Sequence, residues 1–152
     1  MSMVKIYTDG AASGNPGPGG YGTLMMYGQH RKEASEGFRL TTNNRMELLA
    51  VIVGLEMLTR PCQVLVVSDS KYVVDSVEKG WVFNWQKKGF KDKKNVDLWK
   101  RFLAIYPKHK VNFKWIKGHA GHPENERCDA LAVAASKQAN LKIDEGYEAS
   151  VA

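Results

Sequence analysis

The chain has 152 residues, a formal net charge of +6 and ordinary shares of hydrophobic (43%) and charged (25%) residues. This size and composition predict one compact domain that buries a core unaided, and Cys62 and Cys128 show no zinc-binding spacing. No apolar run is long enough to span a bilayer and the first residues lack the layout of a signal peptide, so we expect a cytosolic protein without membrane contact.

The N-terminal part of the chain predicts three strands and a helix. Residues 4–8 alternate in polarity and form a first strand, whereas residues 11–20 are dense in Gly and Pro and form a tight loop. Residues 21–27 and 32–40 form the two strands of a hairpin. Residues 41–58 form a helix that is apolar on almost every side, so we expect this helix to be buried.

The middle of the chain predicts a buried strand and several helices. Residues 63–67 are an apolar, β-branched run, which is typical of a parallel strand covered on both faces. Residues 70–79 form a helix, and residues 81–88 form a further helical turn or two. A loop over residues 89–94 then leads into a helix over residues 96–106, which Pro107 stops.

The C-terminal part predicts one strand and one helix. Residues 110–116 alternate as a strand does, and residues 123–139 form a helix that begins at a proline. We therefore expect one domain over residues 1–140 and a loose tail over residues 141–152. The order of elements predicts an α/β fold whose mixed five-stranded sheet is antiparallel at one edge, parallel in the remainder and flanked by helices.

Positive charge gathers in residues 71–117, which we call the basic stretch. It holds thirteen Lys or Arg against four Asp or Glu, so it carries +9 and the rest of the chain −3. All four tryptophans lie in it: Trp81, Trp85, Trp99 and Trp115. Cations interleaved with flat aromatic rings suit a nucleic acid. A solvated lysine face over core tryptophans has the same composition, so charge alone does not distinguish a nucleic-acid-binding surface from a solvated face.

Four acidic residues stand where a sheet edge can collect them. Asp9 follows the first strand and Asp69 follows the apolar strand; if these strands are parallel neighbours, about 4.8 Å separates their backbones. Their carboxylates then emerge at the edge where open α/β sheets place active sites. Glu47 and Asp129, each near the start of a helix, can point to the same edge. Crowded carboxylates repel one another, and Mg²⁺ relieves that repulsion.

Each acidic residue also has a structural explanation. Asp69 can cap the helix that follows it, Glu47 can complete a capping box with Asn44, and Asp129 can be a surface residue. Paired carboxylates also serve glycoside hydrolysis, but that chemistry leaves the basic stretch unexplained. The residues alone therefore support a pair, Asp9 and Asp69, more strongly than a set of four.

Longer motifs surround these acidic residues. Thr8-Asp9-Gly10 opens a glycine-rich segment, residues 41–47 run Thr-Thr-Asn-Asn-Arg-Met-Glu, Ser68-Asp69-Ser70 follows the apolar strand, and residues 117–129 run Lys-Gly-His-Ala-Gly-His-Pro-Glu-Asn-Glu-Arg-Cys-Asp. In this order and spacing they resemble the bacterial type I ribonuclease H family. The resemblance covers the chain to about residue 140.

The resemblance implies a ribonuclease H-like fold and an endonuclease that cuts the RNA strand of RNA–DNA hybrids, leaving 3′-hydroxyl and 5′-phosphate ends. It places metal-binding carboxylates at Asp9, Glu47, Asp69 and Asp129, with two Mg²⁺ ions during catalysis and Mn²⁺ as a substitute. It places a mobile histidine at His119, which can protonate a leaving group or ferry product. Without the resemblance, His119 is a plain loop residue.

The resemblance also implies a hybrid-binding surface, and we expect a monomer because no long apolar patch is evident beyond the core elements. It places RNA-side contacts at Asn15, Asn43, Asn44 and Lys71; a glutamine is common at the last position, where lysine would instead favour a phosphate. It places a DNA phosphate pocket at Thr42, Arg45 and Asn84, with Trp81, Trp85, Lys87 and Lys88 nearby. Core packing is the alternative for Trp85.

Two other functions fit parts of this pattern. A transposase or resolvase of the same fold would cut duplex DNA, but the Asn43-Asn44 pair and the tryptophan-rich basic stretch favour a hybrid. A hybrid-binding module without activity would not need the complete acidic set. Cleavage assays on different duplexes separate the three functions. Partners such as single-strand-binding proteins cannot be read from the sequence.

Overall fold

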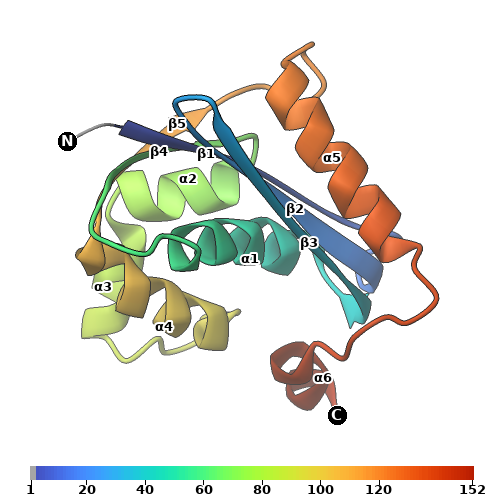
Figure 1. Cartoon of the computed structure of the whole chain (residues 1–152). Coiled ribbons are helices and arrows are strands. Elements are labelled where there is room, and N and C mark those ends of the chain that lie inside the picture. The colour runs from blue at the N-terminus through green and yellow to red at the C-terminus, as the bar shows by residue number, and fades with distance from the viewer. Residues whose placement is uncertain (1–2) are drawn as a thin grey trace.

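A five-stranded sheet organises the computed structural model, which describes residues 3–152 (Figure 1). In chain order the strands are β1 (Met3–Ala12), β2 (Gly17–Tyr27), β3 (His30–Thr41), β4 (Gln63–Ser68) and β5 (Lys110–Trp115). They lie in the order β3-β2-β1-β4-β5, in which β1–β2 and β2–β3 pair antiparallel and β1–β4 and β4–β5 pair parallel. The predicted mixed sheet with one antiparallel edge is confirmed.

Helices cover both faces of this sheet. They are α1 (Asn43–Glu56), α2 (Lys71–Glu78), α3 (Trp81–Lys87), α4 (Val96–Ile105), the 3₁₀ turn η1 (Tyr106–Lys108), α5 (Pro123–Ser136) and α6 (Glu145–Val151). Figure 1 shows α5 on one face and α1 with α2 on the other. None of the helices within residues 3–152 combines the length and the apolar character that crossing a bilayer would require.

Helix α1 is buried on almost every side, as its sequence predicts. Met46, Leu48, Ile52 and Leu55 are each 0% exposed. The helix contacts β1 and β2 across one side and α2 and α4 across another. A helix enclosed in this way needs apolar residues around its circumference, so the missing polar face is explained by packing.

The predicted loop over residues 11–20 is wrong, because most of that segment is strand. β1 continues to Ala12 and β2 begins at Gly17, which leaves only a short turn between them. Glycine in a strand often marks a place where another backbone approaches closely. That is the case here: a Cβ atom on Gly22 would collide with the backbone carbonyl of Cys128 in α5.

Three glycines form a flat seat for α5, which we call the glycine seat. Gly20 and Gly22 lie on β2, and Gly37 lies opposite Gly20 on β3. Added Cβ atoms at all three positions would run into α5, whose buried face is itself made of small residues: Cys128, Ala132 and Ala135. Helix and sheet therefore approach closely, and this approach fixes where the first turns of α5 lie.

The expected loose tail is wrong, because the last residues form helix α6 and fold back onto the sheet. Asp144 caps α6 by accepting from the backbone N–H of Tyr147, and its side chain is buried. Arg39 on β3 donates two hydrogen bonds to Glu148, at 2.8 and 2.9 Å. These contacts join residues about a hundred positions apart, which a local pattern cannot predict.

Candidate active site

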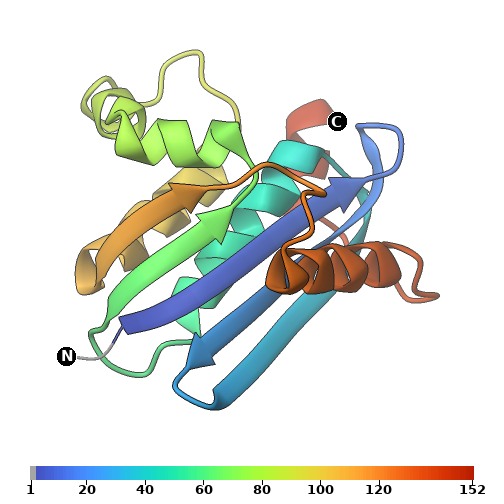
Figure 2. The ribbon, with the colours of Figure 1, turned by 90° about the horizontal axis from the view of Figure 1, so that it is seen from above.

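Asp9 and Asp69 lie side by side because β1 and β4 are parallel and in register. The last parallel pair joins Tyr7 to Val67, and each carboxylate comes two residues later. The expectation that Asp9 ends its strand is wrong, because β1 continues to Ala12, past the end of β4, and pairs with β2 there (Figure 2). The carboxyl edge of β4 nevertheless lies beside Asp9, so the predicted pair is formed.

Glu47 joins this pair from helix α1. One carboxylate oxygen each of Asp9, Glu47 and Asp69 lies within 4.8 Å of the other two, and we call these three residues the acidic cluster. The close approach of α1 depends on Gly10, where a Cβ atom would collide with the backbone of Met46 and Glu47. The glycine after Asp9 therefore lets the third carboxylate reach the other two.

Two oxygens of the acidic cluster are buried without a hydrogen-bond partner. They are Oε1 of Glu47 and Oδ1 of Asp69, which find no donor among residues 3–152. A buried polar atom left without a partner costs free energy, and a charged one costs more. A divalent cation held by oxygen ligands would satisfy both oxygens, so the cluster fits Mg²⁺ in its chemistry and its spacing.

The capping roles considered for the acidic residues belong to their neighbours. Thr42 caps α1 by accepting from the backbone N–H of Arg45, at 3.2 Å. Ser70 caps α2 by accepting from the backbone N–H of Val73, also at 3.2 Å. Neither Asp69 nor Glu47 is engaged in capping, so both carboxylates are available to a ligand.

Burial and the charges of neighbouring carboxylates make Asp9 and Glu47 hard to ionise. Burial and then the charge of Asp69 raise the pKa of Asp9 to about 7. Burial, followed by the charges of Asp9 and Asp69, raises the pKa of Glu47 well above its usual range. Perturbed carboxylates of this kind are typical of functional sites, and a bound cation would restore their charged forms.

Asp129 lies next to the acidic cluster without belonging to it. Its charge and a hydrogen bond contribute to the raised pKa of Asp9, which places it beside that residue. Its ligand oxygens are not among those that converge within 4.8 Å. The structure thus brings together three of the four predicted carboxylates and holds the fourth at their side.

The loop that carries His119 passes over the acidic cluster. A Cβ atom on Gly118 would lie 2.7 Å from Oδ2 of Asp69, so the loop touches that carboxylate. His119 itself is exposed and has a φ of 55°, a left-handed conformation. Its side chain is therefore accessible to solvent and to a bound molecule.

The pH should control both stability and metal affinity at this site. Asp9 in the folded chain holds a proton between about pH 4 and about pH 7 that the unfolded chain, with an ordinary carboxyl pKa, has released. Stability of the metal-free protein should therefore fall as the pH rises through this window. A divalent cation bound here would compete with that proton, so the thermal shift produced by added Mg²⁺ should be larger at about pH 8 than at about pH 5.5. Equal shifts in a melting series would contradict this assignment.

The three expected RNA-side asparagines lie at the turn between β1 and β2 and at the start of α1. Asn15 accepts a hydrogen bond from the backbone N–H of Asn43 at 3.0 Å, and the Asn43 side chain accepts one from the backbone N–H of Ala12 at 2.6 Å. With its oxygen engaged, the amide group of Asn43 keeps its N–H donors free. Asn43 and Asn44 are exposed, so both can reach a ligand.

The four tryptophans of the basic stretch have three different environments. Trp99 is 0% exposed and belongs to the core, whereas Trp81 and Trp115 are each 42% exposed. Trp85 is half-buried: it packs edge-on against Trp99 and lies under the ammonium group of Lys93. Core packing and surface exposure are thus both true of Trp85.

Trp115 has a role that sequence reasoning missed. Its indole N–H donates to the backbone carbonyl of Asp69 at 2.9 Å, and the Lys71 ammonium lies 4.8 Å from the centre of its ring. Alternation along the strand predicts a side chain facing the same way as Val111 and Phe113, which are buried. At the end of β5 the ring instead lies on the surface, where it holds the backbone of Asp69.

Four of the predicted substrate residues line a cavity at α3. A cavity of about 580 Å³ is bounded by Trp81, Asn84, Trp85, Lys88, Lys91, Asp92 and Lys93. Lys87 is exposed on the same helix. Positive charge and aromatic surface therefore do occur side by side here, as binding a phosphate chain requires.

Arg45 differs from its expected role. Its side chain is only 4% exposed and forms ion pairs with Asp97 at 2.7 Å and with Asp144 at 2.8 Å. Burial alone would lower its pKa, and the hydrogen bonds to both carboxylates outweigh that effect and raise it. A guanidinium that already holds two carboxylates has no free edge for a phosphate. Thr42 and Asn84 stay at the surface, but Arg45 lies beneath it.

Comparison with known proteins places this fold and site in one family. The RNase H family model matches residues 1–137. A protein named Ribonuclease H from Desulforamulus reducens is 61% identical over 149 residues, which cover 95% of this chain and 94% of that protein. A Ribonuclease H from Rippkaea orientalis is 59% identical over 150 residues, covering 95% of this chain and 92% of that one.

Solved structures agree with these relatives. LC9-RNase H1, described as a type 1 RNase H with the type 2 active-site motif, has a TM-score of 0.80 and 32% identity, and the match covers 99% of this chain and 81% of that one. LC11-RNase H1, solved in complex with an RNA/DNA hybrid, has a TM-score of 0.69 and 27% identity over 87% of this chain and 95% of that one. The chain belongs to the ribonuclease H family, and it is an enzyme of the endoribonuclease class.

Proposed function

We propose that this chain hydrolyses the RNA strand of RNA–DNA hybrids at a divalent-metal site built on Asp9, Glu47 and Asp69, with Asp129 as a fourth carboxylate. One observation supports it most directly: two buried oxygens of the acidic cluster have no hydrogen-bond partner among the described residues. Oxygen ligands at this spacing suit Mg²⁺, with Mn²⁺ as a substitute.

The residues around the proposed metal site have different roles. Bound Mg²⁺, as two ions, would activate a water and stabilise the leaving oxygen, so that 3′-hydroxyl and 5′-phosphate ends result. Trp115 holds the backbone of Asp69, and Gly10 lets Glu47 approach. His119, exposed beside the carboxylates, supplies a proton to the leaving group or ferries the product.

Recognition of a hybrid requires contacts with both strands. Asn15, joined to the backbone of Asn43, would contact the RNA strand together with Asn43 and Asn44, because amide groups can donate to and accept from the 2′-hydroxyl that distinguishes RNA from DNA. Lys71, whose ammonium group lies 4.8 Å from the centre of the Trp115 ring, would bind a phosphate. The cavity on α3, with Asn84, Trp81, Trp85, Lys87 and Lys88, together with Thr42, would hold the DNA strand. The hybrid bound to LC11-RNase H1 is consistent with this substrate class.

A cleavage assay on three duplexes tests the proposal. The protein is incubated with Mg²⁺ and end-labelled RNA–DNA hybrid, duplex DNA or duplex RNA, and products are sized on a gel. We expect cleavage of the RNA strand of the hybrid alone, and none when a chelator replaces Mg²⁺. An intact hybrid would refute the proposal, binding without cutting would indicate a binding module, and cut duplex DNA would indicate a transposase-like enzyme.

The two adjacent lysines of α3 should set the salt dependence of hybrid binding. Replacing Lys87 and Lys88 by Ala should weaken binding and reduce the slope of log affinity against log salt by about one for each phosphate that a lysine no longer neutralises. Lys108 and Lys110 are exposed near the first residue of β5, at the end of the strand away from Asp69. Their double replacement by Ala is therefore a control with the same charge change. An unchanged slope in the α3 variant would show a merely solvated face.

A cytoplasmic location and a monomeric state stay predictions from the sequence.

A further inference from the structure

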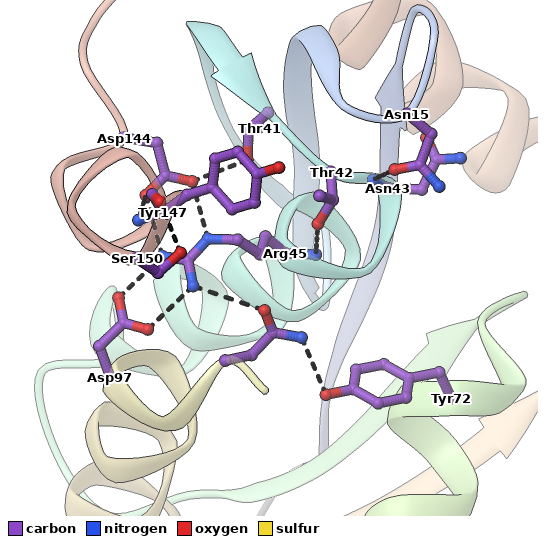
Figure 3. A network of polar contacts seen from close by, with 11 residues as sticks. Asn15, Thr41, Thr42, Asn43, Arg45, Tyr72, Asp97, Asp144, Tyr147 and Ser150 are labelled. Atoms are coloured by element: carbon purple, nitrogen blue, oxygen red, sulfur yellow. Dashed lines mark hydrogen bonds and ion pairs between the residues drawn. The ribbon is translucent and has the colours of Figure 1, made fainter. Parts of the chain in front are cut away.

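A network of polar side chains joins four elements beneath the proposed substrate surface (Figure 3). Arg45 of α1 lies at its centre and contacts Asp144, which caps α6, and Asp97, in the first turn of α4. Arg45 also faces the side-chain oxygen of Asn95 at 3.5 Å. Asn95 donates to the hydroxyl of Tyr72 on α2 at 3.1 Å. One chain of contacts therefore links α1, α2, α4 and α6.

The contacts around Arg45 are specific in their geometry. Nε and Nη2 donate to the two oxygens of Asp144 at 2.8 and 2.9 Å, while Nη1 and Nη2 donate to the two oxygens of Asp97 at 2.8 and 2.7 Å. Both pairs are bidentate, an arrangement that fixes orientation as well as distance. Asn95 itself has a φ of 62°, so the segment entering α4 is held in a less common conformation.

Three residues of the network each follow an exposed polar or charged residue. Asn44 precedes Arg45, Lys71 precedes Tyr72, and Lys94 precedes Asn95; all three are exposed. A cavity of about 690 Å³ lies over the network, lined by Asn15, Thr42 and Asn44 on one side and by Tyr147 and Ser150 of α6 on another. The network is therefore the floor of that surface, and α6 borders it.

We propose that Arg45 is a positioning residue for hybrid binding and that α6, through Asp144, is part of the binding surface and not an appendage. This inference rests on the proposed function. Arg45 holds the first turn of α1 against the basic segment before α4, so the RNA-side asparagines and the lysines keep a fixed separation. Arg45 also offsets one of the two negative charges of Asp97 and Asp144, which reduces their repulsion of a phosphate chain passing above them.

Stability alone is a weaker explanation of the network. Burying ionic groups costs desolvation free energy, and well-packed apolar residues often stabilise a fold equally well. A second ion pair, Arg39–Glu148, already fastens α6 to β3 without touching Arg45. The Asp144 contact therefore adds orientation at the floor of the cavity, beyond what attachment of the helix requires.

The matched variants are Asp144→Asn, which removes the charge at the network, and Glu148→Gln, which removes the other ion pair of the same helix. Hybrid affinity is measured by fluorescence anisotropy with Ca²⁺ in place of Mg²⁺, alongside KM, kcat and melting temperature. We expect Asp144→Asn to weaken affinity about ten-fold and raise KM equally, with a much smaller change in kcat. Glu148→Gln should change affinity less than about two-fold.

Asp97→Asn keeps the inference testable if Asp144→Asn does not fold, because its side chain is 48% exposed and tolerates replacement more readily. Gly146→Ala gives an independent steric test, since its Cβ atom would collide with the Asp97 carboxylate and push it from Arg45. Lower melting temperatures with unchanged affinity and KM would overturn the inference, as would an equal loss in Glu148→Gln. Absent cleavage with intact affinity would instead refute the proposed function.

Discussion

Replacing Asp9 by asparagine is expected to reduce cleavage of an RNA–DNA hybrid by at least about 10³-fold while the chain stays folded. Asp9 is 6% exposed and belongs to the acidic cluster with Glu47 and Asp69. A surface carboxylate therefore cannot take its place as a metal ligand. An asparagine keeps the shape and the hydrogen bond to the backbone N–H of Gly10, but it removes the negative charge that a cation needs.

The same variant should be more stable than the wild type when metal is absent. At about pH 8 the wild-type cluster carries charges that repel one another in a buried place, and asparagine removes one of them. Active sites often hold such strain, so the loss of activity should come with a higher melting temperature. Added Mg²⁺ should raise the melting temperature of the wild type and have little effect on Asp9→Asn.

Asp75→Asn is the matched control for this prediction. Asp75 lies on α2 and forms only an i,i+4 ion pair with Lys79 at 3.7 Å, so the same chemical change occurs at a distance from the acidic cluster. Turnover in the control should stay within about two-fold of the wild type, since surface ion pairs contribute little. Near-normal turnover in Asp9→Asn would remove Asp9 from the site and with it the proposed mechanism.

Replacing Gly22 by valine is expected to destabilise the fold by about 3 kcal/mol and to lower hybrid cleavage in the fraction that stays folded. Gly22 belongs to the glycine seat, where any side chain meets the Cys128 carbonyl and the Leu131 side chain of α5. The helix must lift from the sheet to make room. Asp129, one residue after Cys128, would move with it and away from Asp9.

Urea denaturation followed by circular dichroism measures the loss of stability, and the hybrid assay at low denaturant measures the loss of activity. Gly28→Asn is the control, because Gly28 lies in the hairpin turn with nothing within 4 Å of an added Cβ atom. Asparagine tolerates its positive φ of 58° better than other side chains do. If Gly22→Val unfolds at the wild-type urea concentration, the close approach of α5 is not a requirement of the fold.

Local sequence patterns are sufficient to predict most of the strands and helices. Residues 63–67 alone carry the β-branched run of a doubly covered strand, and the structure places that strand between two parallel neighbours. The pairing of Asp9 with Asp69 follows from strand order, because parallel strands bring their carboxyl ends to one edge. Both conclusions use information that lies within a few residues of the positions concerned.

The wrong predictions fall where a distant part of the chain decides the structure. The density of glycine in residues 17–20 predicts a loop because glycine is rare in strands, yet α5 needs Gly20 and its neighbour Gly22 in order to pack. The motif around Arg45 predicts a phosphate contact and does not predict the partners that the structure shows, Asp97 and Asp144, which come 52 and 99 residues later. Neither carboxylate has a local signal that would identify it as a partner of Arg45.

The parallel register of β1 and β4 has a consequence for how this protein folds. Asp9 and Asp69 are far apart along the chain and meet only when the two strands have paired, so the acidic cluster does not exist in the unfolded ensemble. A cation cannot nucleate such a site and binds only after this long-range pairing has formed. Mg²⁺ should therefore slow unfolding rather than speed folding, and it selects chains whose topology is already native.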